Sequence, residues 1–211
     1  MILIVTLNPL LERRFSYQDI RRGKVNRNAI TSIAAGGKGI NVSRQLKKLG
    51  IKSFNYFFSG GNDGKIFRDI LKKDDFDFSF VATKSETRNA AVIISEQEKN
   101  VTSYFSKNSK ILQNEADEFK SKLDKMIQNC EIVVFSGSSP CKETDSIIPF
   151  GIDLANKYDK ISICDTYGSS LKDCIDATPT IIHNNYVEVE NSFNLKLDNE
   201  EAILAFINNL Y

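Results

Sequence analysis

A glycine-rich segment at residues 36–42, with the sequence GGKGINV, is the clearest candidate for chemistry in this chain. Apolar residues recur at helical spacing after it, at Ile40, Val42 and Leu46, so the glycines stand where a helix begins. Unpaired backbone N–H groups and the helix dipole favour an anion or an oxygen-rich ligand there, and glycine lets that ligand approach the backbone closely. The segment therefore predicts a small-ligand site, although a structural turn before a helix explains the same glycines.

Two common phosphate-binding motifs do not fit this segment. A P-loop would need glycine at Ser32 and serine or threonine at Gly39. The dinucleotide fingerprint would need its last glycine at Val42. An unrelated nucleotide-binding α/β domain is therefore a disfavoured interpretation.

The composition indicates which partners to expect. The 28 basic and 27 acidic residues give a net charge of +1, so no global field favours nucleic acid or an anionic membrane. The four cysteines form no Cys-x-x-Cys pair and His183 is the single histidine, so the usual zinc patterns are missing. Residues 1–9 reach Asn8 and Pro9 too soon for a signal peptide or membrane span. We expect a cytoplasmic protein with no nucleic-acid or membrane partner.

The elements around the glycine segment alternate between strand and helix. Apolar runs predict strands at residues 2–7, 51–59, 78–82, 132–135, 161–164 and 180–182. Helical spacing predicts helices at residues 40–49, 65–73, 114–129, 144–157 and 198–211. A short helix that ends at about residue 176 follows the turn at 165–168, and a glycine turn is predicted at 60–64. This alternation predicts an α/β fold with a parallel sheet covered on both faces and ligands at the carboxyl ends of its strands.

Two further regions favour strands with one solvated face. Residues 10–35 mix polar, basic and β-favouring residues, and residues 90–95 and 101–105 are joined by a polar turn. We expect these strands to form a small lid beside the main sheet.

Several motifs recur in a fixed order along the chain, and together they resemble the ribokinase-like carbohydrate kinases of the phosphofructokinase B type. They are residues 6–13 (TLNPLLER), 23–27 (GKVNR), 36–44, 60–64, 86–88 (ETR), 136–140 (SGSSP), 165–168 (DTYG) and 185–188. The resemblance is closest to the branch of 1-phosphofructokinase and tagatose-6-phosphate kinase. It implies a three-layer α-β-α sandwich with a mostly parallel central sheet, with residues 1–211 as one domain and lid strands inserted at about 10–35 and 88–106.

The same resemblance implies the activity. Members of this branch transfer the γ-phosphate of ATP, with Mg²⁺, to a ketohexose phosphate such as fructose 1-phosphate, fructose 6-phosphate or tagatose 6-phosphate. Family members often pair through their lid strands, so a homodimer is an expected assembly. A C-terminal complement supplied by another polypeptide is the alternative.

The resemblance also assigns sugar-binding residues. It places Glu12, where aspartate is usual, on the sugar hydroxyls, and Gly37, Lys38 and Asn41 along the sugar site. The extra methylene of glutamate changes the reach of that carboxylate.

Lys24 and Arg88 would hold the phosphate that the substrate already carries, because cationic side chains suit that task. Ordinary solvated charge is the alternative for both residues, since the segment around Lys24 is basic throughout. Ser138 would contact the same phosphate or cap a turn.

Asn185 and Glu188 correspond to the family's Asn-x-x-Glu element, whose glutamate helps to position Mg²⁺ and its waters. Oxygen ligands suit that cation. A helix cap and a partner for the helix dipole explain the same pair. The family's Lys-Pro-Asn has become His183, Asn184 and Asn185 here, and His183 is interpreted as a satisfied structural histidine.

The resemblance implies no catalytic residue within this sequence. The family's catalytic base lies in a Gly-Ala-Gly-Asp turn, and no glycine follows Gly168 here. We therefore expect the C-terminal part of the fold and the ATP site to be missing, with no turnover by these 211 residues and an uncovered sheet edge that promotes self-association. The chain would be part of a truncated kinase, a fragment completed by a heteromeric partner, or a non-catalytic sugar-phosphate-binding module.

Overall fold

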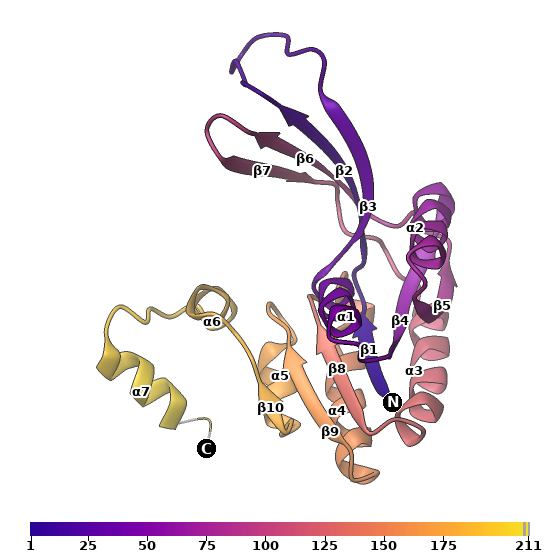
Figure 1. Cartoon of the computed structure of the whole chain (residues 1–211). Helices are drawn as coiled ribbons and strands as arrows, with labels where there is room; N and C mark the ends of the chain where they lie inside the picture. Colours follow the sequence, from indigo (N-terminus) through magenta and orange to yellow (C-terminus); the bar gives the residue numbers. More distant parts are fainter. Residues whose placement is uncertain (209, 211) are drawn as a thin grey trace.

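The computed structural model describes residues 1–208 and 210, and its centre is a six-stranded parallel sheet (Figure 1). Each neighbouring pair in the order β10-β9-β8-β1-β4-β5 is parallel. The strands are β1 (Ile2–Thr6), β4 (Ser53–Gly60), β5 (Asp77–Thr83), β8 (Ile132–Ser136), β9 (Ile161–Asp165) and β10 (Ile181–Ile182). Because β1, β8 and β9 are adjacent and parallel, the turns that follow them lie side by side at the carboxyl edge of the sheet.

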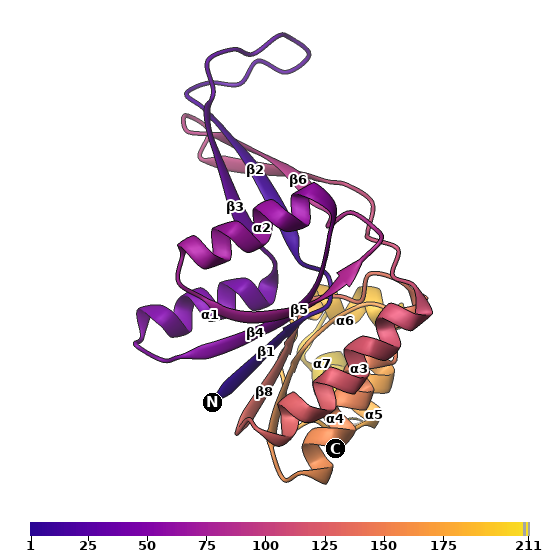
Figure 2. The same cartoon turned by 90° about the vertical axis from the view of Figure 1, so that its right-hand side faces the viewer.

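Helices cover both faces of this sheet, as Figure 2 shows. One face carries α1 (Lys38–Lys48) and α2 (Gly61–Lys73), and the other carries α3 (Gln113–Gln128), α4 (Ile147–Lys157) and α5 (Leu171–Asp176), with a short 3₁₀ turn at Lys142–Thr144. The predicted three-layer α/β architecture with a parallel sheet is therefore confirmed.

Strand β4 explains why the apolar runs are continuous rather than alternating. Tyr56 and Phe58 pack on one side against Phe119 of α3, with ring centroids 4.0 and 4.3 Å away. Phe57 points to the opposite side and meets the edge of the Phe67 ring in α2. Both faces are buried, so the buried polar side chains within the strand, Asn55 and Ser59, are hydrogen-bonded. The Tyr56 hydroxyl accordingly donates to the Phe119 carbonyl at 3.2 Å.

A second sheet is separate from the main one and projects from its carboxyl edge (Figure 1). Its order is β3-β2-β6-β7, built from β2 (Leu10–Tyr17), β3 (Ile30–Gly36), β6 (Asn89–Ser95) and β7 (Asn100–Phe105). The outer pairs are antiparallel hairpins, and the two hairpins are joined by the parallel pair β2–β6. Strand β2 follows β1 after only three residues, so the second sheet begins beside the end of β1.

The chain beyond β10 forms two helices beside the sheet edge, α6 (Tyr186–Phe193) and α7 (Glu200–Asn208) (Figure 1). The helix predicted for 198–211 is observed over the bounds of α7, and residues 209 and 211 of that prediction lie outside the described residues. In the part of the chain that the structure describes, no helix is long and apolar enough to cross a bilayer.

The glycine turn predicted at 60–64 is wrong, because α2 already begins at Gly61. The helix is capped from a distance: the Glu86 carboxylate lies against the bare α-carbon of Gly61 and accepts the Asp63 N–H at 2.9 Å. A cap 23 residues away lies outside any local pattern.

Candidate functional site

The first turn of α1 lies directly against the end of β1, and glycine makes this approach possible. Gly37 is the N-cap of α1 with φ 115°, a conformation that L-residues rarely adopt. At Gly39 a Cβ atom would overlap the Thr6 hydroxyl and come within 3.0 Å of Ile4 Cγ2. The Thr6 hydroxyl is buried and has no hydrogen-bond partner among the described residues.

Lys38 connects this turn to two distant elements. Its ammonium lies 3.0 Å from Asp165 Oδ1 at the end of β9 and 2.5 Å from Glu188 Oε1 in α6, and 5.0 Å from the centre of the Tyr167 ring. Burial lowers the pKa of Lys38, but the hydrogen bonds to Glu188 and Asp165 outweigh it, so the pKa lies above the ordinary lysine value. Three elements, α1, β9 and α6, therefore converge on one cation.

Asp165 lies in the motif at 165–168, but no role for it was predicted from the sequence. Besides Lys38, it accepts a hydrogen bond from the Ser136 hydroxyl at 2.7 Å, through Oδ2. A signal existed, since Asp165 ends an apolar strand at the carboxyl edge of a parallel sheet, where ligands gather. His183 lies beside it, with Nδ1 3.5 Å from Asp165 Oδ1. The interpretation of His183 as a satisfied structural histidine is wrong, because its side chain is 77% exposed.

Asn185 and Glu188 form a capping box at the start of α6. The Asn185 side chain accepts the Glu188 N–H at 2.9 Å, and Glu188 Oε2 accepts the Asn185 N–H at 3.4 Å. The cap uses one carboxylate oxygen of Glu188, while the other faces Lys38. The capping role is thus present, and it leaves one oxygen directed at a cation.

The carboxylates of Asp165 and Glu188 are the oxygens suited to a divalent ion. Both face one point, which the Lys38 ammonium occupies. Among residues 1–208 and 210, no group of three or more His, Cys, Asp or Glu side chains is arranged to hold a metal. Mg²⁺ commonly takes one or two carboxylates and completes its shell with water and phosphate oxygens, so this pair fits such an ion but not an all-protein cage.

A second polar group surrounds Arg88, close to the β1–β2 turn. Its guanidinium donates to the Asn8 carbonyl at 3.0 Å and to Asn108 Oδ1 at 3.1 Å, and it stands 5.6 Å from the Phe105 ring. Its Nε is buried and has no partner within the described residues. Burial lowers the pKa of Arg88 from its usual value. Arg88 is therefore not the ordinary solvated charge of the alternative interpretation.

Ser138 belongs to the same group. The buried Asn8 side chain donates to Ser138 Oγ at 3.3 Å and to Asn108 Oδ1 at 3.1 Å. The neighbouring Gly137 N–H donates to the Asp165 carbonyl at 2.9 Å, so the turn after β8 joins the Arg88 group to the Lys38 group.

Glu12 and Asn41, two further predicted site residues, are each hydrogen-bonded to a nearby arginine. Glu12 accepts two hydrogen bonds from Arg14, at 2.6 and 2.9 Å, and packs against Gly36. Asn41 accepts from Arg44 at 3.0 Å and lines, with the Lys38 group, a groove of about 460 Å³.

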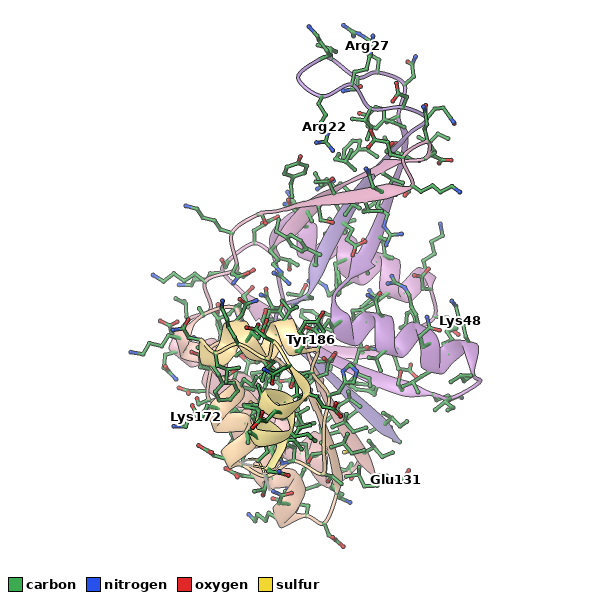
Figure 3. The ribbon with its side chains drawn as sticks, turned by 90° about the vertical axis from the view of Figure 1, so that its left-hand side faces the viewer. Arg22, Arg27, Lys48, Glu131, Lys172 and Tyr186 are labelled. Atoms are coloured by element: carbon green, nitrogen blue, oxygen red, sulfur yellow. The ribbon has the colours of Figure 1, made fainter. Side chains whose placement is uncertain are left out.

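Lys24 is not brought to the other predicted residues. It is exposed in the loop that joins β2 to β3. Figure 3 shows Arg22 and Arg27 of this loop at the end of the second sheet that is remote from the main sheet. Two cations, Lys38 and Arg88, and several hydrogen-bonding groups thus converge at the carboxyl edge, an arrangement suited to a small anionic, hydroxyl-rich ligand.

Comparison with known proteins shows similarity to carbohydrate kinases over nearly the whole chain. Residues 6–210 match the profile of the pfkB family carbohydrate kinases. A tagatose-6-phosphate kinase of Staphylococcus epidermidis is 32% identical over 202 residues, which cover 95% of this chain and 64% of that protein. The chain thus spans about 64% of the length of this curated relative.

Solved structures agree in fold. A possible 1-phosphofructokinase of Thermotoga maritima superposes with a TM-score of 0.89 at 26% identity, covering 99% of this chain and 68% of that one. Phosphofructokinase-2 of Escherichia coli, solved in a tetrameric inhibited form and in complex with fructose-6-phosphate, has a TM-score of 0.85 at 21% identity, covering 99% and 69%.

Proposed function

Because this chain belongs to the pfkB family of carbohydrate kinases, we propose that its site binds a ketohexose phosphate as the acceptor of a phosphate group from ATP. The observation that supports this most directly is Arg88. Its guanidinium is held by Asn8 and Asn108, yet its buried Nε lacks a partner in the described chain. A buried N–H without a partner costs free energy, which a phosphate oxygen would recover.

The other residues fit around that phosphate. Ser138, joined to Arg88 through Asn8, supplies a hydroxyl to the same oxygens. The open start of α1 at Gly37, with Lys38 and Asn41, would take the sugar. Glu12 would accept hydrogen bonds from the sugar hydroxyl groups in addition to those from Arg14. Lys24 would contribute only if the loop that carries it approached the site from another position or another subunit.

ATP and Mg²⁺ are the cosubstrate and cofactor that this proposal requires. Asp165 and Glu188, with Asn185 fixing Glu188, are the residues that would hold the ion, directly or through water. A bound Mg²⁺ would neutralise charge on the phosphates during transfer. Lys38 would then release one or both carboxylates.

The names of the relatives support a proposal for the substrate. One relative is named tagatose-6-phosphate kinase, and phosphofructokinase-2 of Escherichia coli has been solved with fructose-6-phosphate. We propose that this chain takes tagatose 6-phosphate or fructose 6-phosphate, with fructose 1-phosphate as the third candidate.

Calorimetric titration tests the acceptor site without requiring turnover. The purified chain should bind one or more of the three ketohexose phosphates, and free fructose should bind far more weakly. Arg88→Ala should weaken binding about 10- to 100-fold, the usual effect of losing hydrogen bonds to a charged group. Lys172→Ala, which removes an exposed cation of α5, is the control. No binding, or binding that Arg88→Ala leaves unchanged, contradicts the proposal.

A turnover assay separates the kinase from a non-catalytic sugar-phosphate-binding module. Formation of a sugar bisphosphate from ATP, abolished when Mg²⁺ is chelated, supports the kinase. If the purified chain binds the sugar phosphate but forms no sugar bisphosphate, it is a non-catalytic sugar-phosphate-binding module.

We further propose that two copies pair through the second sheet. Its strand registers place Ile30, Ile94 and Val101 in one row on the face that also carries Phe105. Ile30, Val101 and Phe105 are each more than half exposed. Sedimentation velocity should show a dimer that Val101→Glu dissociates and that Thr102→Glu, on the opposite face of β7, leaves intact. Equal sedimentation of all three proteins contradicts this assembly.

A further inference from the structure

The segment 86–89, which carries Arg88, is attached to the start of α2. Glu86 accepts the Asp63 N–H at 2.9 Å. Thr87 bonds to Gly60 in both directions: its N–H donates to the Gly60 carbonyl at 2.9 Å, and its hydroxyl accepts the Gly60 N–H at 3.0 Å. The motifs at 60–64 and 86–88, distant in sequence, are therefore two halves of one joint.

Asp63 is the residue that extends this joint to the second sheet. One carboxylate oxygen accepts from Arg13 Nη2 of β2 at 2.5 Å, and the other accepts from Asn89 Nδ2 of β6 at 2.7 Å. Asp63 is only 6% exposed, whereas the Arg13 side chain is 40% exposed. A nearly buried carboxylate thus bridges the two central strands of the second sheet from a helix of the main body.

The bridged residues are sequence neighbours of two proposed substrate contacts. Arg13 follows Glu12 directly, and Asn89 follows Arg88. A backbone hydrogen bond, from the Leu11 N–H to the Arg88 carbonyl at 3.0 Å, links the two strands at the same level. A displacement of either strand at this joint would move Glu12 or Arg88 relative to the β1–β2 turn.

We propose that Asp63 is a positioning residue for sugar-phosphate binding, which holds β2 and the segment 86–89 so that Glu12 and Arg88 face the ligand together. This inference rests on the proposed function for its ligand. A carboxylate suits the task because its two oxygens accept from two donors at once, and one of these bonds is charge-assisted. The neutral amide of asparagine retains the shape and loses the charge, and it offers a single acceptor atom.

The experiment compares Asp63→Asn with a control of the same charge change on the same helix, Asp69→Asn, whose position is exposed. A second variant, Arg13→Gln, removes the contact to β2 and leaves the first turn of α2 intact. Two measurements are made on each variant of the 211-residue chain. The first is the affinity for fructose 6-phosphate and tagatose 6-phosphate by calorimetry. The second is hydrogen exchange of the Leu11 amide without ligand, by NMR.

Asp63→Asn and Arg13→Gln are expected to bind sugar phosphate roughly tenfold more weakly and to exchange the Leu11 amide several-fold faster, because a misaligned hydrogen bond to a charged group loses part of its contribution to binding. Asp69→Asn should match the wild type in both measurements. An affinity within twofold of the control overturns the proposal, whatever happens to exchange, and so does unchanged Leu11 exchange. If the wild type itself binds no sugar phosphate, the proposed function fails, and Leu11 exchange alone decides whether Asp63 holds the two strands.

Discussion

The Lys38 ammonium lies 2.5 Å from the Glu188 carboxylate, although the two residues are 150 positions apart in the chain. This contact, with the one to Asp165, places a permanent cation where two carboxylates converge. A divalent ion that uses the same oxygens must therefore compete with a side chain of the protein.

Replacement of Lys38 should strengthen binding of a divalent cation. Lys38→Met leaves Asp165 and Glu188 with uncompensated charge, so their affinity for Mn²⁺, a paramagnetic substitute for Mg²⁺, should rise roughly tenfold by Coulombic attraction. Electron paramagnetic resonance of free Mn²⁺ measures the change. Lys38→Arg, which retains the charge, should bind as the wild type does, and the double variant with Glu188→Gln should lose the gain. A Lys38→Met variant with wild-type affinity would show that the carboxylates do not hold the ion.

Gly39→Ala should lower the free energy of unfolding by about 2 kcal/mol, because a methyl group added to a tightly packed site typically has a cost of this size. Its methyl group meets the Thr6 hydroxyl and Ile4 on β1. Thr6→Ala in the same chain should restore part of the loss, and a double-mutant cycle in urea measures this coupling. Gly168→Ala, with open space around its Cβ but a φ of 91°, measures instead the cost of a left-handed backbone, which the helical Gly39 does not carry. Strict additivity of the Gly39 and Thr6 changes would contradict the predicted contact.

Asn185 allows the capping role to be separated from metal binding. Asn185→Ala should destabilise α6 by about 1 kcal/mol, seen as faster exchange of the Glu188 amide, because the cap is lost. Asn185→Ser keeps a capping oxygen and should exchange as the wild type does. Weaker Mn²⁺ binding by the serine variant would then report a metal role independent of the cap, and equal binding would restrict Asn185 to capping.

Tyr56 should make stability depend on alkaline pH. Burial is the main cause that raises the pKa of Tyr56 well above the ordinary tyrosine value, with the charge of Glu118 second. The folded state therefore favours the neutral phenol. This contribution is fully present below pH ~10, the unfolded tyrosine pKa, and is lost as pH rises above it.

In Tyr56→Phe the free energy of unfolding should fall less steeply above pH ~10, while at neutral pH about 1 kcal/mol is lost with the hydrogen bond to the Phe119 carbonyl. Urea unfolding at several pH values measures both effects. Tyr104→Phe, which removes an exposed phenol of β7, is the control. Equal slopes in Tyr56→Phe and the wild type would contradict the assignment.

The parts of the fold that depend on local periodicity were predictable from the sequence. Strand β4 has the consecutive aromatic residues 56–58 because both of its faces are buried, and α1 shows its buried side as a 3.6-residue repeat. The family motifs indicated the turns after β1 and β8 and the start of α1 as the places to look for a ligand site. Local patterns were sufficient wherever the structure is determined by neighbours within one or two turns.

Contacts between distant residues were not predictable in this way. The start of α2 depends on Glu86, which accepts the Asp63 N–H. The role of Asp165 depends on its contact with Lys38, which lies 127 positions earlier in the chain. The exposure of His183 depends on the path that the chain takes after β10. None of these contacts produces a pattern within a few consecutive residues of the sequence, so local periodicity cannot predict them. Arg88 illustrates the limit: the sequence shows a basic residue, but its burial follows from Asn8 and Asn108, which other segments supply.

The parallel pairing of β2 with β6 joins segments that are far apart in the sequence. Each hairpin of the second sheet is local, but residues 11 and 89 become neighbours only by closing a loop that contains β3, α1, β4, α2 and β5. Closing so long a loop costs entropy before any contact offsets it, and contacts of high sequence separation slow folding. We therefore expect the main sheet to form first, with the parts that would grip a sugar phosphate completed last. A nascent chain would gain its ligand affinity only at the end of that sequence.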